Sequence, residues 1–463
     1  MSVYFLRTLC RSFSNSAYQI LRIFNIYPSP KRTSLSPYLL EPFAVIGETL
    51  RGQRLASGLP WWSIFQATIN HIITGIVQDW LARSGQLPLS ILIYSNSYKK
   101  LVSPLADIIK QYSNRWSDLA LHIPDSYYQC FHATDNHAPM FKSIQFHCSF
   151  NSRADMNFQL TCPRLERASF TYYPINGTNI HWDNLTHFTL RFMSIINFFL
   201  ILRKTPRLVF CKLSSLCSLD RGRTVGAPVL TSLRCLQLMI TSSVDDSLNS
   251  LIAPHLEEFS LPNYFKPSME VITSFLRRSV CSLRSFSVIL SIFSSYLKSF
   301  MDLLQSMPSL NTLSIISTTK TTYHSHNTIP EDYDICNILR LVAKVLSSQS
   351  TSLQQGFLPN LKILEYTGKL HLRPGNYDDL YFLPPADNAL HGPLHLLKFN
   401  IHPATRIPKH MISYFSSLME LGVTVNGLSK SKDILQSSID YYRSNDDSLS
   451  QDWIDNLDSS LFP

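Results

Sequence analysis

The segment APHLEEFSL, residues 253–261, contains the short pattern that decides the fold class of this chain. After Pro254 it places Leu256, Phe259 and Leu261 at the spacing Leu-x-x-Φ-x-Φ, where Φ is an apolar residue. Side chains alternate between the two faces of a β-strand, so Phe259 and Leu261 share one face and Ser260 lies on the other. The segment therefore predicts a short strand with one buried face.

The same pattern recurs along most of the chain, often after a proline. Further copies are CPRLERASF (162–170), TPRLVFCKL (205–213), TSLRCLQL (231–238), CSLRSFSVIL (281–290), MPSLNTLSI (307–315), LPNLKILEY (358–366) and FSSLMELGV (415–423). Weaker copies are RWSDLALHI (115–123), FKSIQFHC (141–148), DNLTHFTL (183–190) and LHLLKFNI (394–401). So many copies indicate a repeat protein in which each unit contributes one strand.

The spacing between copies identifies the kind of repeat. The first apolar anchors are Ile144, Leu165, Leu185, Leu208, Leu233, Leu256, Leu283 and Leu310, with successive spacings of 21, 20, 23, 25, 23, 27 and 27 residues. Leucine-rich repeats have periods of about 20–29 residues. The next anchor, Leu361, follows Leu310 by 51 residues, so we expect a degenerate repeat or an insertion near 317–357.

Helical segments lie between the predicted strands. Residues 268–279 and 295–306 each place apolar residues on one helical face, and the apolar run 192–202 reads as a buried helix too short to span a bilayer. We expect each proline to end a helix and give an extended start to the next strand. The predicted fold class is α/β: an irregular leucine-rich-repeat solenoid over residues 66–425, without the consistent asparagine that follows many such strands.

The region before the repeats contains the clearest single helix, residues 61–83, with Gly85 at its expected C-terminal cap and a strand at 88–93. The junction WLARSGQLPLSILI (80–93) resembles a motif of fungal F-box/leucine-rich-repeat-like proteins. Similar resemblances occur in NRWSDLALHIP (114–124), HWDNLTHFTL (181–190) and RRSVCSLRSFSV (277–288).

This resemblance implies an F-box, a short helical module that binds the adaptor subunit of a cullin-RING ubiquitin ligase. LRGQRLASGLPWWSIF (50–65) is similar to its second half and SAYQILRIFNIYPSP (16–30) to its first. The implied adaptor-binding residues are Ile20, Leu21, Ile23 and Phe24. The segment 16–65 lacks the usual Leu-Pro start and has Gln19 in place of an acid, so the F-box is degenerate. The alternative is that residues 16–83 only cap the first repeat.

The charge distribution and the cysteine content indicate which partners and which cellular compartment to expect. The net charge of +9 is spread thinly, between a basic leader (1–15, continuing to about residue 60) and an acidic C-terminal tail (426–463). Without a long Lys/Arg cluster we expect no nucleic-acid partner, and we expect no membrane partner. Nine cysteines without CxxC pairs predict reduced, buried thiols and a cytoplasmic or nuclear location. The first forty residues lack acids, which leaves a mitochondrial leader as the alternative.

No motif indicates catalysis, so we expect no enzyme activity, no cofactor and no metal. His391 and His395 have metal-like spacing, but Pro393 between them argues against a helix. Cys211 and Cys217 are expected to be packed thiols, and acid pairs such as Asp245-Asp246 are expected in polar loops. Only 14 glycines occur, and none forms a phosphate-binding loop.

The sequence therefore predicts a protein-binding repeat protein. The role implied by the resemblance is substrate recognition in an F-box-type cullin-RING ubiquitin ligase, for a target protein that the sequence does not identify. The alternative is a free-standing repeat scaffold with a decayed F-box. The expected partner-binding residues are those on the outward face of the strands: Glu166, Arg167, Arg234, Gln237, Glu257, Glu258, Arg284, Asn311 and Lys362.

Overall fold

The structure, a computed structural model, describes most of the repeat region in segments. These are residues 74–94, 99–123, 125–131, 137–147, 159–171, 179–217, 228–239, 244–261, 268–289, 297–316, 357–368, 394–401, 407, 409–420, 422–429 and 432–445. The chain divides into two compact units, described separately below. Unit 1 comprises Met1–Met193 and Lys204–Leu208, and unit 2 comprises Ser194–Arg203 and Val209–Pro463.

Unit 1 is built on parallel strands in the order β1-β2-β3-β5-β7. Their bounds are β1 Leu89–Tyr94, β2 Trp116–His122, β3 Ser143–His147, β5 Arg167–Thr171 and β7 His187–Arg191. Residues 74–83 are helical, followed by α4 (Lys99–Lys110), η2 (Ser113–Arg115), η3 (Asp125–Phe131) and the parallel pair β4 (Gln159–Leu160) and β6 (Asn179–Ile180). The short strand β8 (Met193–Ser194) lies at the boundary between the units.

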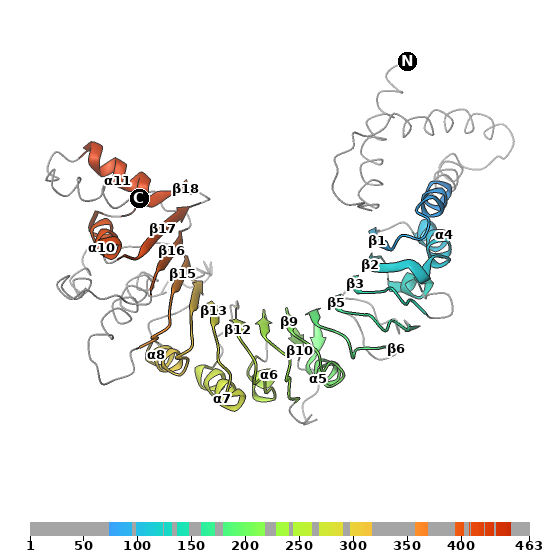
Figure 1. The fold of residues 1–463 in the computed structure, drawn as a ribbon, viewed down its shortest axis with the longest axis horizontal. Helices are drawn as coiled ribbons and strands as arrows, with labels where there is room; N and C mark the ends of the chain where they lie inside the picture. Colours follow the sequence, from blue (N-terminus) through green and yellow to red (C-terminus); the bar gives the residue numbers. More distant parts are fainter. Residues whose placement is uncertain are drawn as a thin grey trace, which may run out of the picture. The chain divides into compact units, whose positions relative to one another are not determined.

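Unit 2 continues the alternation of parallel strands and helices (Figure 1). Its strands are β9 Phe210–Leu213, β10 Leu216–Cys217, β11 Cys235–Leu238, β12 Glu258–Leu261, β13 Ser285–Ile289, β14 Thr312–Ile316, β15 Ile363–Gly368, β16 Leu396–Ile401, β17 Thr424–Ser429 and β18 Lys432–Asp433. Its helices are α5 Ile195–Arg203, α6 Val244–Asn249, α7 Met269–Ser279, α8 Leu297–Gln305, α10 Lys409–Glu420 and α11 Ile434–Asn445. Helices α6, α7 and α8 lie on the same side of the strands (Figure 1). This α/β arrangement is consistent with the predicted solenoid.

The predicted apolar positions form the core of both units. The leucine anchors from Leu165 to Leu361 are all buried, none more than 2% exposed. Register corrects the first anchor: Ile144 pairs with Ala168, so the residue equivalent to Leu165 is Phe141. Both Phe141 and Ile144 are buried and apolar, which is why composition alone did not distinguish them. The repeat from Phe141 to Leu165 is therefore 24 residues long, not 21.

The prolines before the strands occupy tight turns. In eight of the described repeats the anchor's backbone N–H donates to the carbonyl three residues earlier, as from Leu165 to Cys162 (3.2 Å) and from Leu256 to Ala253 (3.3 Å). Where proline is present, as at Pro163 and Pro254, it is the second residue of this four-residue turn. Its fixed φ suits that position. The proline therefore shapes the turn, rather than ending a helix as the sequence analysis expected.

A repeated backbone hydrogen-bond pattern holds the starts of most of the described parallel strands in register. In each case one carbonyl accepts two N–H groups from the next repeat: Glu257 O accepts from Arg284 N (2.8 Å) and Ser285 N (3.0 Å), and Arg284 O accepts from Asn311 N (2.8 Å) and Thr312 N (2.9 Å). Two asparagines add side-chain links that were not expected. Asn184 Nδ2 donates to Pro163 O (2.7 Å), and Asn360 Nδ2 donates to Pro308 O (3.0 Å).

The 51-residue gap between anchors is explained by direct pairing of β14 with β15. Leu313 lies opposite Leu364, and Asn360 bonds the turn that precedes β14. Leu310 and Leu361 are thus equivalent anchors on neighbouring strands. Residues 317–356 lie outside the described residues.

The C-terminal part of unit 2 corrects two predictions. FSSLMELGV was expected to be a strand, but residues 409–420 form α10, because Phe415 and Leu418 are buried at helical spacing. The acidic tail was expected from residue 426, but β17, β18 and α11 continue the folded chain to Asn445. A Cβ at Gly427 would lie 3.1 Å from Leu435 Cβ, so glycine allows α11 to pack closely on β17. Strand β18 pairs antiparallel with β17.

The junction at residues 80–93 is held by a buried arginine. Gly85 has φ +58°, as expected for the cap of the helix 74–83. The Arg115 side chain, 5% exposed, donates from Nε to Leu87 O (3.0 Å), from Nη1 to Leu81 O (3.3 Å) and from Nη2 to Ser84 Oγ (2.6 Å). Residues 80–93 and 114–124, quoted above for their resemblance, are thus in contact. No helix within the described ranges is long and apolar enough to cross a membrane.

Candidate protein-binding surface

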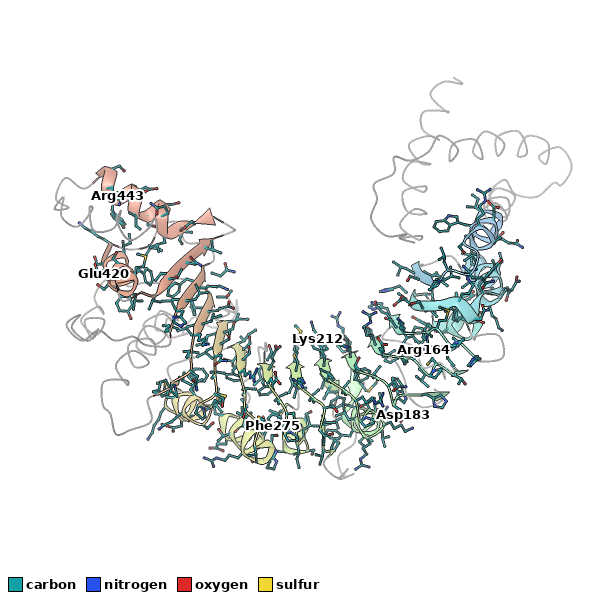
Figure 2. The ribbon with its side chains drawn as sticks, in the orientation of Figure 1. Arg164, Asp183, Lys212, Phe275, Glu420 and Arg443 are labelled. Atoms are coloured by element: carbon teal, nitrogen blue, oxygen red, sulfur yellow. The ribbon has the colours of Figure 1, made fainter. Side chains whose placement is uncertain are left out.

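The side of the strands opposite the core carries polar side chains in rows, one per repeat. We call the polar residues that directly follow the anchors the entrance row, and the residues between the last two core positions the mid-strand row. In unit 2 the entrance row contains Arg234, Glu257, Arg284, Asn311, Lys362 and His395. The mid-strand row contains Lys212, Gln237, Ser260, Ser287, Ser314, Glu365, Lys398 and Asn426. In Figure 2 Lys212 lies on the strand side and Phe275 among the helices.

None of the nine predicted partner-binding residues is buried. Glu166 and Arg167 lie in unit 1; the other seven lie in unit 2, where Arg234, Glu258, Arg284 and Lys362 are exposed and Gln237, Glu257 and Asn311 are half-buried. Neighbouring repeats place the row members one strand apart, about 4.8 Å. The predicted adaptor-binding residues Ile20, Leu21, Ile23 and Phe24 lie outside the described residues.

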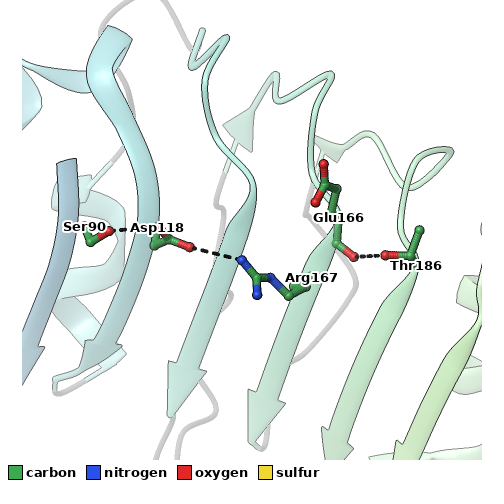
Figure 3. Close-up of polar contacts among 5 residues, drawn as sticks. All are labelled: Ser90, Asp118, Glu166, Arg167 and Thr186. Carbon is green, nitrogen blue, oxygen red and sulfur yellow. Dashed lines mark hydrogen bonds and ion pairs between the residues drawn. The ribbon is translucent and has the colours of Figure 1, made fainter. Parts of the chain in front are cut away.

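In unit 1 the exposed face carries a polar chain across β1, β2 and β5 (Figure 3). Ser90 Oγ donates to Asp118 Oδ2 at 2.9 Å, and Asp118 Oδ1 lies 3.8 Å from Arg167 Nη2. Glu166 uses its backbone carbonyl, which accepts from Thr186 Oγ1 at 3.0 Å, so its carboxylate is not needed for that bond (Figure 3). Arg167 therefore presents a charge that is already paired, although both partners are well exposed and the pair is weak.

A stacked histidine pair lies at the C-terminal ends of β2 and β3. The rings of His122 and His147 are 5.0 Å apart and nearly parallel, and Gln145 Nε2 lies 3.5 Å from His122 Nε2. Burial, and then the neighbouring charge of His147, lower the pKa of His122. The neutral form of His122 is therefore favoured in the folded chain.

In unit 2 the charged side chains of the exposed face divide into paired and unpaired groups. Arg234 Nη1 lies 2.7 Å from Glu257 Oε1, and Lys398 Nζ lies 2.7 Å from Glu365 Oε1. Arg284 and Lys362 have no ion-pair partner among the residues that the structure describes. On β12, β13 and β14, the mid-strand row consists of Ser260, Ser287 and Ser314, which all have short side chains.

Several surface residues were missed by the sequence analysis. Asp118, His122, His147, Lys212, His395 and Lys398 all lie on the exposed side of their strands. All but His122 and His147 follow from applying the core-x-x-core-x-core pattern to segments already quoted (115–123, 205–213 and 394–401). The Glu365–Lys398 pair joins residues 33 apart, so only the pairing of β15 with β16 reveals it.

The structure describes several of the cysteines and acidic residues that could carry chemistry. Burial raises the pKa of Cys211 above its usual range and that of Cys162 to about 12, so both thiols are protonated at neutral pH. Asp245 and Asp246 lie in the first turn of α6, not in a loop, and Asp245 Oδ1 accepts from Ser268 N at 3.3 Å. Within the described ranges, no three His, Cys, Asp or Glu side chains converge as metal ligands.

Comparison with known proteins does not assign the chain to a family. No protein-family model matches the sequence, and a search of curated proteins finds no significant match.

Proposed function

We propose that this chain is a non-catalytic repeat protein that binds another protein on the exposed face of its strands. The observation that supports the proposal is the entrance row of unit 2, where polar and charged side chains follow one another on adjacent strands over a rigid, buried core. Such a row presents several side chains at a fixed spacing to one partner. Charges of both signs favour selectivity through electrostatic complementarity.

The more specific proposal is substrate recognition in an F-box-type cullin-RING ubiquitin ligase. It is supported by the resemblance of residues 16–65 and of the junction 80–93 to fungal F-box/leucine-rich-repeat-like proteins. In this role the chain performs no chemistry and raises the local concentration of a target beside a ubiquitin-loaded partner. The departures at the start of the F-box favour the alternative, a scaffold that no longer binds the adaptor.

Strand-face binding is tested by site-specific photo-crosslinking in the full chain. A photo-reactive residue at Arg234 should crosslink a defined partner, and the same residue at Arg277, exposed in α7 on the helix side, should not. Changing both Arg234 and Arg284 to Glu should weaken binding of that partner. It should also reduce the dependence of this binding on salt concentration. Equal crosslinking from both faces would overturn the proposal.

Adaptor binding has its own test, a pull-down of purified F-box adaptor by the full chain. Ile20→Asp with Phe24→Asp should abolish it, and the matched control Ser14→Asp with Ser16→Asp, which adds the same charge, should retain it. No adaptor binding by the unaltered chain at micromolar concentration would leave the scaffold alternative.

A further inference from the structure

Part of the entrance row in unit 2 is cationic and continuous. Arg284, Asn311, Lys362 and His395 occupy equivalent positions directly before β13, β14, β15 and β16, and successive backbone bonds of 2.8, 2.8 and 2.9 Å join them. Three strand spacings separate the first from the last, about 14 Å. Arg284, Lys362 and His395 are exposed and Asn311 is half-buried, so all four present polar groups at the surface.

Two of the acidic residues near this row are already paired, and the third, Glu258, exposed at the start of the neighbouring strand β12, forms no ion pair with Arg284 among the described residues. Glu257 lies between Arg234 and Arg284 in the row, and its carboxylate pairs with Arg234 at 2.7 Å. Glu365 is the acidic residue on this face of β13–β16 among the described residues, and it pairs with Lys398. Within the part of the chain that the structure describes, Arg284 and Lys362 therefore form no ion pair with a carboxylate. Ser285 and Thr312, half-buried beside the row, add hydroxyl donors.

We propose that Arg284, Asn311, Lys362 and His395 bind an acidic segment of a partner protein that runs across the strands. Arg284 and Lys362 are two strand spacings apart, about 9.6 Å. A polyproline II segment rises about 3.1 Å per residue with three residues per turn, so side chains three apart share a face at about 9.3 Å. The preferred ligand is thus Asp/Glu-x-x-Asp/Glu in that conformation, with Asn311 donating to the backbone between the two acids.

This inference rests on the proposed strand-face binding and names the chemistry of the partner. The probe is a fluorescein-labelled peptide with glutamates at every third position and prolines between them, titrated against the full chain by fluorescence anisotropy. A peptide of the same composition with the glutamates adjacent tests spacing. We expect the spaced peptide to bind more tightly and to weaken with salt, since the contacts are exposed.

Two double variants locate the binding. Arg284→Glu with Lys362→Glu should lower the affinity for the spaced peptide roughly tenfold or more, because attraction becomes repulsion at both contacts. Arg277→Glu with Lys298→Glu makes the same charge change at exposed positions of α7 and α8, on the helix side, and should leave affinity within about twofold. Asn311→Asp, nearly isosteric, should also weaken binding.

Several outcomes would overturn the inference. Equal loss in the two double variants would show general charge attraction rather than a site. Binding of a single-stranded oligonucleotide, with the same dependence on Arg284 and Lys362 and no peptide binding, would make the row a nucleic-acid surface. Peptide binding only after Asp446, Asp447, Asp452, Asp455 and Asp458 are changed to Asn would identify the chain's own C-terminal segment as the occupant. No peptide binding with strand-face crosslinking intact would reject this inference and leave the proposed function standing.

Discussion

The two units use the same strand pattern but fill the space behind the strands differently. In unit 1, rings contact one another from Trp116 through Phe141, and from Tyr128 through Phe146, Phe170, Trp182 and Phe188. Of the eleven largest fully buried side chains among the described residues, seven lie in unit 1. In unit 2 the equivalent positions are mostly aliphatic, and the rings form smaller groups: Phe259 with Phe275 and Phe286, and, in the C-terminal repeats, Tyr366 with Phe399, Phe415 and Tyr414.

The connections behind the strands differ in a way that matches this contrast. The unit 1 repeat from Leu165 to Leu185 has 20 residues, and its described connection is the short strand β6. The unit 2 repeat from Leu256 to Leu283 has 27 residues and contains α7, 11 residues long. A helix covers the back of the strands with its own apolar face. A short extended connection does not, so larger side chains are needed to reach native packing density.

The largest expected effect is on the core of unit 2. Leu256→Asp removes a fully buried side chain and introduces a charge without a partner, at a cost of about 5 kcal/mol or more. Because repeats contact only their neighbours, hydrogen exchange measured by mass spectrometry should show lost protection in β11–β13 first. In the control variant Glu257→Asp, at the next position, β11–β13 should remain protected from hydrogen exchange. Unchanged protection in the Leu256 variant would contradict this account of the core.

The next prediction tests the aromatic packing of unit 1. Phe170 contacts Phe146, Trp182 and Phe188 with ring centroids 5.8, 5.9 and 6.2 Å apart. Phe170→Ala should lower the free energy of unfolding by about 3–5 kcal/mol, measured by chemical denaturation. Leu238→Ala in unit 2, at the equivalent buried position, is the matched aliphatic truncation, at about 2–5 kcal/mol. Phe170→Leu should still destabilise, because ring contacts are lost; a neutral result would show that the rings are not required.

A smaller effect is expected at buried polar groups. Arg115→Lys keeps the charge but cannot make the three bonds to Leu81, Ser84 and Leu87, and should cost about 1.5–3 kcal/mol. In unit 2, Ser279→Ala leaves the Ala253 N–H without its 3.1 Å bond to Ser279 Oγ, and should cost about 1–3 kcal/mol. Chemical denaturation measures both. A lysine as stable as the arginine would mean that the guanidinium geometry is unimportant.

The smallest effect is the pH dependence of unit 1. Because the pKa of His122 is lowered in the folded state, the unfolded chain binds more protons below about 6.5, the usual histidine value. Stability contributed by neutral His122 is therefore present above that pH and is lost as the pH falls. The denaturation midpoint should drop between pH 7.5 and 5.5, and His122→Gln should reduce the drop. An equal drop in the variant would exclude His122 as its source.

The sequence by itself determined the strand positions, because the alternation of apolar residues is a local property of each segment. Leu165, Leu256 and Leu310 are buried as the pattern requires, and α7 matches the predicted helix within one residue at its start. The cap at Gly85 was equally local. The exposed positions of the predicted surface followed from the same alternation, which is why none of them is buried.

Tertiary structure decided which repeats are neighbours and how their side chains combine. The segment 415–423 fits the strand pattern, yet it lies largely within α10, because helical spacing of Phe415 and Leu418 also buries apolar residues. The equivalence of Phe141 with Leu165 required the pairing of β3 with β5. Likewise, Glu257 lies between two arginines in the row, and only the folded geometry shows that it pairs with Arg234 and leaves Arg284 available. Such choices depend on distances between residues far apart in the chain, which no local pattern contains.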